Sequence, residues 1–168
     1  LYARYNTNLT RIEHKGIKLY DDILDNIRDW QICASLDGTG AIGEYIRTGL
    51  KYDQWVEHFK EGLKHSRHRR MMRIDFTLTT PGLSEIENIC KLADDLGVDI
   101  LAKVTFGFTP DIAMSPLFLP RDILNETITE LLDKVDRPVI RDMLNNLLAR
   151  PTFEEEYPND YIDGRHRG

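Results

Sequence analysis

The chain has 168 residues, with 22 Lys and Arg against 28 Asp and Glu, which gives a formal net charge of −6. Its 41% hydrophobic and 30% charged residues are typical of a folded globular protein and exclude a disordered or collagen-like chain. No uncharged apolar run approaches the roughly 18 residues that a membrane helix needs, so no membrane partner is expected. The acidic balance argues against nucleic acid as the main partner.

Two cysteines, Cys33 and Cys90, are too few for a disulfide framework. They indicate a reducing compartment, and we expect the cytoplasm. The chain begins at Leu1 rather than Met, directly in a strand-like stretch, which suggests a fragment of a longer protein.

Strand-like and helix-like segments alternate along the chain. A stretch rich in Tyr and Thr over residues 2–9 predicts a strand. Apolar residues that recur every three or four positions predict a helix over residues 19–30. A short apolar run over residues 31–36 predicts the second strand, which ends in the turn residues 37–40.

The middle of the chain repeats this order. Helical periodicity returns over residues 52–64, where Asp53 is a candidate N-cap. Strict alternation of apolar and polar residues predicts a strand over residues 73–79. Ser84 and Glu87 have the spacing of a capping box, which predicts that the next helix begins there.

Gly97 is the expected end of that helix, and residues 98–108 predict the fourth strand. Two further helices are expected to begin at Pro120 and Pro138. From Pro151 onward the chain is polar and resembles a frayed tail or linker.

The sequence therefore predicts the order β-α-β-α-β-α-β-α-α and an α/β fold. Strands joined by helices imply parallel pairing with right-handed crossovers. Four such units could form a small doubly wound sheet or an arc of a barrel. We expect one domain over residues 1–150, followed by a polar tail or linker over residues 151–168.

Ligands of both architectures bind at the carboxyl ends of the strands, so the polar residues there are the candidate site. Ser35 and Asp37 are two positions apart and point the same way in an extended strand. The Asp37 carboxylate can accept two hydroxyls of a ribose-like ligand, and Arg47 can bind a carboxylate with two hydrogen bonds. An Asp-Gly turn and a surface ion pair are the structural alternatives for these residues.

Three other patterns have structural explanations as well. Gly38, Gly40 and Gly43 fit the G-x-G-x-x-G spacing of dinucleotide sites, but the acidic residue expected about 20 positions later is missing from a strand end. The pair His65-x-x-His68 is the closest approach to a metal motif, and it lies in the basic segment 64–70. That segment could contact phosphates or could simply be a solvated connection.

The segment Ser35-Leu36-Asp37-Gly38, followed by Glu44-Tyr45-Ile46-Arg47, is similar to radical S-adenosylmethionine (SAM) enzymes. It is most similar to those with a twitch or SPASM-type C-terminal extension. In that family the fourth barrel strand ends in Ser-x-Asp-Gly, and a Tyr-x-Arg motif follows. Tyr5-Asn6-Thr7-Asn8 resembles the family's third strand, and residues 114–120 resemble the loop after the sixth strand.

The resemblance implies an arc of a partial (β/α)6 TIM-like barrel, represented here by strands three to six and the C-terminal helices. It implies that Ser35 and Asp37 contact bound SAM, that Arg47 pairs with its carboxylate, and that Asn8 lines the same site. In the family, a [4Fe-4S] cluster on a Cys-x-x-x-Cys-x-x-Cys loop cleaves SAM to a radical that acts on a peptide, protein, nucleotide or small molecule.

That cysteine loop and the twitch cysteines are missing here. The cluster would belong only to a longer parent protein, and this chain alone is expected to be catalytically inactive. One alternative is a stand-alone α/β module that binds SAM or a nucleotide without catalysis. A second is a nucleic-acid contact through residues 64–73. An open sheet edge beside the missing strands would also favour self-association.

Overall fold

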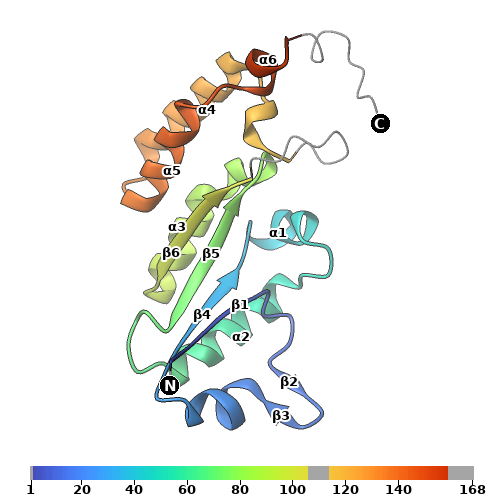
Figure 1. Ribbon diagram of the computed structural model, residues 1–168, viewed down its shortest axis with the longest axis vertical. Helices are drawn as coiled ribbons and strands as arrows, with labels where there is room; N and C mark the ends of the chain where they lie inside the picture. Colours follow the sequence, from blue (N-terminus) through green and yellow to red (C-terminus); the bar gives the residue numbers. More distant parts are fainter. Residues whose placement is uncertain (1, 106–113, 159–168) are drawn as a thin grey trace.

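A computed structural model describes residues 2–105 and 114–158 of the chain (Figure 1). Four parallel strands form the central sheet in the order β1-β4-β5-β6, which is also their order along the chain. Their bounds are Tyr2–Thr7 for β1, Asp29–Ser35 for β4, Met72–Leu78 for β5 and Asp99–Val104 for β6. The predicted α/β class with four parallel strands is confirmed.

A small hairpin and six α-helices complete the described part of the fold. A small antiparallel hairpin, β2 (Glu13–His14) and β3 (Ile17–Lys18), lies between β1 and β4 in the chain. No helix in the described part of the chain is long and apolar enough to cross a membrane. The α-helices are α1 (Gly40–Ile46), α2 (Tyr52–His65), α3 (Ile86–Leu96), α4 (Arg121–Lys134), α5 (Pro138–Leu148) and α6 (Phe153–Glu156).

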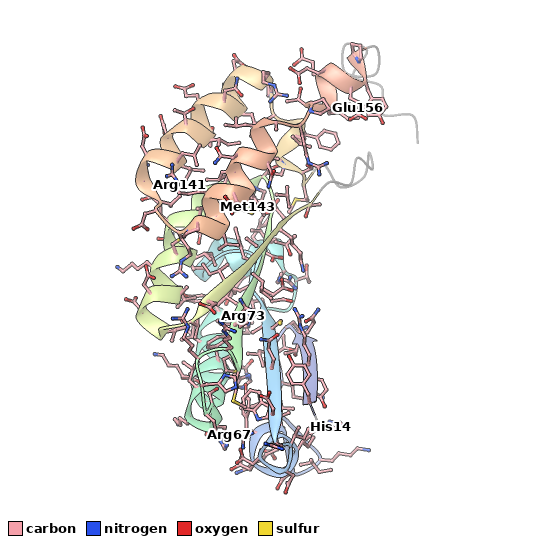
Figure 2. All side chains as sticks on the ribbon, turned by 60° about the vertical axis from the view of Figure 1, so that its left-hand side comes forward. His14, Arg67, Arg73, Arg141, Met143 and Glu156 are labelled. Carbon is pink, nitrogen blue, oxygen red and sulfur yellow. The ribbon has the colours of Figure 1, made fainter. Side chains whose placement is uncertain are left out.

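The two faces of the sheet differ in chemistry. On one face Ile32 and Met72 are fully buried, and a Cβ added to Gly62 of α2 would lie 2.7 Å from Met72 Sδ. The strands lie in front of α2 and α3 in Figure 1, and Figure 2 places both helices on one side of β4. Side chains alternate along a strand, so Arg73 and Asp75 point to the opposite face. We call this opposite side the open face; its polar character is unusual, because parallel sheets are usually buried on both sides.

The segment predicted as one helix over residues 19–30 is irregular instead. It forms the π-helical turn η1 (Leu19–Ile23) and the 3-10 turn η2 (Leu24–Asn26), and β4 begins three residues later. Trp30 pairs with Ala3 of β1 and is fully buried. The end of the predicted helix is therefore in the sheet, because strand pairing overrides the local apolar period.

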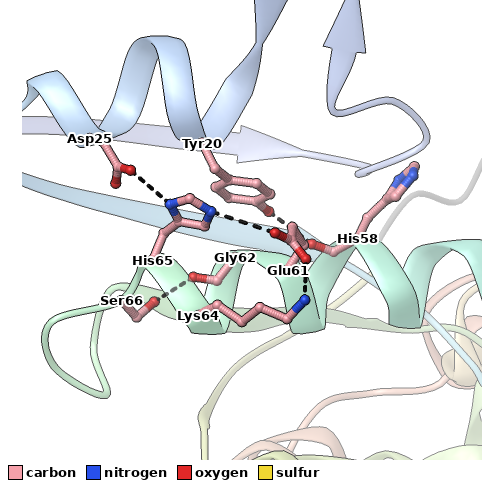
Figure 3. A network of polar contacts seen from close by, with 8 residues as sticks. All are labelled: Tyr20, Asp25, His58, Glu61, Gly62, Lys64, His65 and Ser66. Carbon is pink, nitrogen blue, oxygen red and sulfur yellow. Dashed lines mark hydrogen bonds and ion pairs between the residues drawn. The ribbon is translucent and has the colours of Figure 1, made fainter.

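A polar network fastens this irregular segment to α2 (Figure 3). The Tyr20 ring stacks on His65 with centroids 5.4 Å apart, and the Tyr20 hydroxyl donates to the His58 carbonyl at 3.1 Å. His65 Nδ1 lies 2.9 Å from Asp25 Oδ2, and its Nε2 lies 3.6 Å from Glu61 Oε1. Burial raises the pKa of the Tyr20 hydroxyl far above its usual value, so this group remains a neutral donor.

The predicted helix over residues 52–64 is present, but its predicted cap is wrong. The N-cap is Lys51 rather than Asp53, which lies in the first turn. The free N–H of Tyr52 donates to Glu44 Oε1 of α1 at 2.9 Å, so a side chain from a neighbouring helix replaces the local cap.

The capping box predicted for Ser84 and Glu87 does not form. A 3-10 turn, η3 (Pro81–Glu85), precedes α3, and Ser84 Oγ donates to the Pro81 carbonyl at 3.0 Å. Glu87 forms an ion pair with Lys134 of α4 at 3.2 Å. The predicted stop at Gly97 is confirmed, since this residue has φ of 66° in the left-handed region that glycine favours.

The C-terminal segment also differs from the expected frayed tail. Thr152 is fully buried and forms a capping box with Glu155 at the start of α6. Glu155 Oε1 also accepts from Arg121 Nε at 2.9 Å, which ties α6 to α4. The end of the predicted fourth strand (106–108) and the last ten residues of the chain lie outside the described residues.

Candidate functional site

The predicted site residues Asn8 and Ser35 lie side by side at the carboxyl edge of the sheet. Thr7 of β1 pairs with Ala34 of β4, so Asn8 and Ser35 are the next residues of two neighbouring strands. Ser35 is half-buried, and Asn8 is exposed. Asn8 Oδ1 accepts from the Thr10 hydroxyl at 3.0 Å, which fixes the turn after β1 and leaves the Asn8 amide N–H₂ group as a donor.

Asp37 and Arg47 are also brought together, but they bind each other. Asp37 Oδ2 lies 2.7 Å from Arg47 Nε, and Asp37 Oδ1 accepts from the Thr77 backbone N–H at 3.0 Å. The Nε–H is not aligned for a hydrogen bond, so the contact is an ion pair. Asp37 is 6% exposed and has both oxygens engaged, whereas the Arg47 side chain is 30% exposed. The pair therefore presents a cation at the edge of the sheet and holds it in place.

Sequence reasoning missed Glu85, a buried carboxylate that holds the same turn from the other side. Glu85 Oε2 accepts from the Thr39 N–H at 2.7 Å and from the Thr39 hydroxyl at 2.5 Å. Its Oε1 accepts from Asn88 Nδ2 at 3.2 Å. In the sequence, Glu85 is only a glutamate that follows the break at Pro81-Gly82. Glutamates near such breaks are too common for this position to indicate a role.

The glycine spacing of the turn has a packing explanation. A Cβ added to Gly43 would lie 2.1 Å from the Gly38 carbonyl oxygen, so α1 starts in direct backbone contact with the turn after β4. A side chain at Gly43 is sterically excluded, and this contact accounts for Gly38 and Gly43 without a bound dinucleotide.

The open face below this edge carries paired charges. Lys103 Nζ of β6 lies 2.9 Å and 3.1 Å from the two Asp75 carboxylate oxygens. Arg73 Nη2 lies 3.7 Å from Asp99 Oδ2. On β1, interaction with the Cys33 side chain of the neighbouring strand β4 raises the pKa of the Arg4 guanidinium. The open face thus carries charged side chains that pair with one another.

The described residues supply no ligand set for a metal ion or an iron–sulfur cluster. Within residues 2–105 and 114–158, no group of three or more His, Cys, Asp or Glu could hold a metal ion. Cys33 and Cys90 are free thiols on β4 and α3. The residues present therefore do not fit the [4Fe-4S] cluster of the family that the sequence resembles, and no chemical step through a cluster can be assigned to them.

Arg67, Arg69 and the two histidines of the basic segment 64–70 form contacts within the fold at the opposite edge of the sheet. Arg67 donates to the Ile27 carbonyl at 2.9 Å, and Arg69 pairs with Asp99 at 2.6 Å. His68 Nε2 lies 3.4 Å from Asp29 Oδ1, whereas His65 belongs to the network with Asp25 and Glu61. Figure 2 shows Arg67 at the end of the molecule that also carries the hairpin. The pair His65-x-x-His68 thus does not converge on one site.

Comparison of the chain with models of protein families, with curated proteins and with solved structures finds no match. The interpretation of the site therefore depends on its own geometry.

Proposed function

We propose that the carboxyl edge of the sheet binds SAM, and that the chain is the strand-three-to-six part of a radical SAM barrel. One observation carries this proposal: at the carboxyl edge of the parallel sheet, Asp37 holds Arg47 in an ion pair. Arg47 Nε lies 2.7 Å from Asp37 Oδ2. An arginine fixed in this way can use its terminal N–H groups to bind a ligand carboxylate. SAM carries a carboxylate at the end of its amino-acid part.

The neighbouring residues supply the groups that the rest of the ligand needs. Ser35 offers a hydroxyl as donor and acceptor, and Asn8 offers its amide N–H₂ group as a donor, since the Asn8 oxygen accepts from Thr10. Each oxygen of Asp37 already has a partner, Arg47 or Thr77, so a direct contact of Asp37 with a ribose would use the second lone pair of an oxygen that is already engaged. We therefore assign Asp37 first to positioning Arg47, and direct contact with SAM remains a prediction.

The sheet itself supports the barrel interpretation. The four strands of the central sheet run parallel and in chain order, and the helix-covered face is apolar while the open face is polar. In a barrel, the face away from the helices becomes the lumen, where a polar ligand can be enclosed. An unidentified substrate of the parent protein would lie over Asp75 and Lys103. A cytoplasmic location is part of this proposal and is supported by the two free thiols.

The chain supplies no ligand set for the cluster among its described residues, so we assign it SAM binding and no cleavage of SAM. The same observation favours the second candidate, a stand-alone binding module without catalysis. The two candidates predict the same ligand. They differ in whether the parent sequence carries three clustered cysteines before Leu1.

Isothermal titration calorimetry with the 168-residue chain tests the proposal. Arg47→Ala should weaken SAM binding by roughly 10- to 100-fold, because a hydrogen bond to a charged group contributes about 1.5–3 kcal/mol. It should leave the binding of 5′-methylthioadenosine unchanged, since this nucleoside lacks the amino-acid carboxylate. Arg69→Ala is the matched control, because Arg69 is exposed and pairs with Asp99 at the other edge.

Two results would count against the proposal. One is no heat of binding and no thermal shift of the wild-type chain with millimolar SAM. The other is an equal loss of SAM and methylthioadenosine affinity in Arg47→Ala, which would mean that Arg47 supports the fold of the edge and does not bind a carboxylate.

A further inference from the structure

The turn that follows β1 has an unfavourable backbone conformation at Leu9. This residue has φ of 49°, in the left-handed region that L side chains rarely adopt because their Cβ crowds a neighbouring carbonyl. Its side chain is fully buried and anchors the turn in the core. Lys15 has a similar φ of 51°, but it lies in the two-residue turn between β2 and β3, where such a conformation is ordinary. The conformation of Leu9 therefore needs an explanation of its own.

Hydrogen bonds hold this turn from two directions. The Leu9 N–H donates to Thr7 Oγ1 at 3.1 Å, and the Thr10 hydroxyl donates to Asn8 Oδ1 at 3.0 Å. Both of these bonds join residues two positions apart. A further contact comes from α2, where His58 Nδ1 lies 2.7 Å from the Leu9 carbonyl oxygen, 49 positions away in the chain. Because a carbonyl oxygen can only accept, Nδ1 carries the proton and donates it.

His58 is itself held in place. The Tyr20 hydroxyl donates to its main-chain carbonyl at 3.1 Å, so the residue belongs to the network that fastens η1 to α2. Figure 3 shows its imidazole directed away from that network. The side chain is half-buried. One residue of α2 thus binds η1 through its main chain and the turn after β1 through its ring.

We propose that His58 is a positioning residue of the candidate site: its Nδ1–H holds the Leu9 carbonyl and thereby fixes Asn8 for contact with the ligand. Unfavourable backbone conformations persist where the surrounding structure enforces them, and they are concentrated at binding sites. Asn8 directly precedes Leu9 and lies beside Ser35, so a change of the Leu9 backbone would move Asn8 relative to Ser35. This inference rests on the proposed function, since it takes Asn8 as a contact of bound SAM.

Nitrogen-15 NMR of the ligand-free chain tests the hydrogen bond. At a pH where the His58 ring is neutral, its proton should reside on Nδ1 rather than Nε2. His58→Ala should raise the hydrogen-exchange rate of the Leu9 N–H by about tenfold. The N–H of Leu36, which donates to the Asp75 carbonyl at 3.0 Å inside the sheet, is the internal reference and should exchange as before. A neutral ring with its proton on Nε2 overturns the proposal.

Calorimetry with SAM tests the consequence for binding. His58→Ala should weaken SAM binding by about three- to tenfold. His58→Asn should restore it, because the amide nitrogen of Asn is bonded to Cγ, as Nδ1 is, and can donate to Leu9. His58→Gln fills the same space but carries its nitrogen one bond farther out, so it should not restore binding. His68→Ala is the matched control, since His68 is exposed at the opposite edge of the sheet. Thermal melts should show that the variants remain folded.

A double-mutant cycle with Asn8 tests the route of the effect. In an Asn8→Ala background, His58→Ala should cause no further loss of SAM affinity, because His58 acts through Asn8. Additive losses would overturn the inference. If the wild-type chain binds SAM and His58→Gln binds it equally well, the positioning role is wrong and the SAM site stands. If the wild-type chain does not bind SAM, the proposed function fails and the role of His58 in SAM binding fails with it, while the ring tautomer still shows whether the bond to Leu9 exists.

Discussion

Asp37 joins three parts of the structure through one carboxylate: its Oδ2 lies 2.7 Å from Arg47 Nε, and its Oδ1 accepts the Thr77 N–H at 3.0 Å. The turn after β4 is thereby tied to the end of α1 and to β5. Because Asp37 is buried and Arg47 is partly exposed, the carboxylate is the fixed member of the pair and the guanidinium is the member that can reach a ligand.

Two substitutions of Asp37 should measure the contributions of its Arg47 and Thr77 contacts to stability separately. Asp37→Asn keeps an oxygen for the Thr77 N–H and removes the ion pair; because the remaining Arg47 side chain is 30% exposed and can be solvated, the free energy of unfolding should fall by only about 1 kcal/mol. Asp37→Ala also leaves the Thr77 N–H without its partner and should lower it by about 2 kcal/mol. Urea denaturation of both variants measures the difference. Equal losses in the two variants would show that the Thr77 contact contributes nothing.

Glu85 should be required for the stability of the same turn. Glu85→Gln leaves a single acceptor oxygen where the carboxylate now accepts from Thr39 and Asn88 through two. We expect a loss of about 1–3 kcal/mol of unfolding free energy, because the half-buried Thr39 loses part of its hydrogen bonding to the buried Glu85 side chain. Glu87→Gln is the control, since Glu87 is exposed and its ion pair with Lys134 lies on the surface. A thermal melt in which both variants behave alike would contradict this role.

The backbone contact between α1 and the turn should make Gly43 intolerant of a side chain. Gly43→Ala would place a Cβ 2.1 Å from the Gly38 carbonyl oxygen, and neither backbone segment can move away without breaking the turn. We expect a loss of about 3 kcal/mol. Gly97→Ala is the comparison, because its φ of 66° is strained for alanine but no atom lies within 4 Å of its Cβ. It should cost about 1–2 kcal/mol. Guanidinium chloride unfolding ranks the two variants, and a smaller effect at Gly43 than at Gly97 would refute the steric explanation.

Glu155 should make the docking of α6 sensitive to acid. The hydrogen bond from Arg121, with help from the Thr152 N–H, lowers the pKa of this carboxyl from 4.5 to about 2. A lowered pKa in the folded state means that the stabilisation is complete above pH 4.5 and is lost as the pH falls towards 2. The difference in unfolding free energy between wild type and Glu155→Gln should therefore be constant from pH 7 to about pH 5 and shrink below that.

Chemical denaturation at several pH values measures this difference. Glu154→Gln provides the control, because Glu154 lies on the same short helix and is exposed. The difference in unfolding free energy from wild type should change with pH for Glu155→Gln and should stay constant for Glu154→Gln. A pH-independent difference for Glu155→Gln would mean that its carboxylate is not the group that holds α6.

Much of the fold follows from local patterns in the sequence. Alternation predicts the strand that became β5, the three-to-four period predicts α2, and Gly97 predicts the end of α3, because each of these signals acts over a few residues. The helix predicted over residues 19–30 was wrong: two short turns replace it, and at its end Trp30 pairs with Ala3 of β1. That pairing joins residues 27 positions apart, and no local period can report it.

For the candidate site, the sequence by itself determined the residue types: Ser35 and Asp37 at the end of a strand, and Arg47 about ten residues later. Only the tertiary structure decided how they are used. It pairs Asp37 with Arg47 and brings Glu85 against Thr39. The packing of whole strands and helices determines which of these residues contact each other. Their separation in the sequence does not predict these contacts.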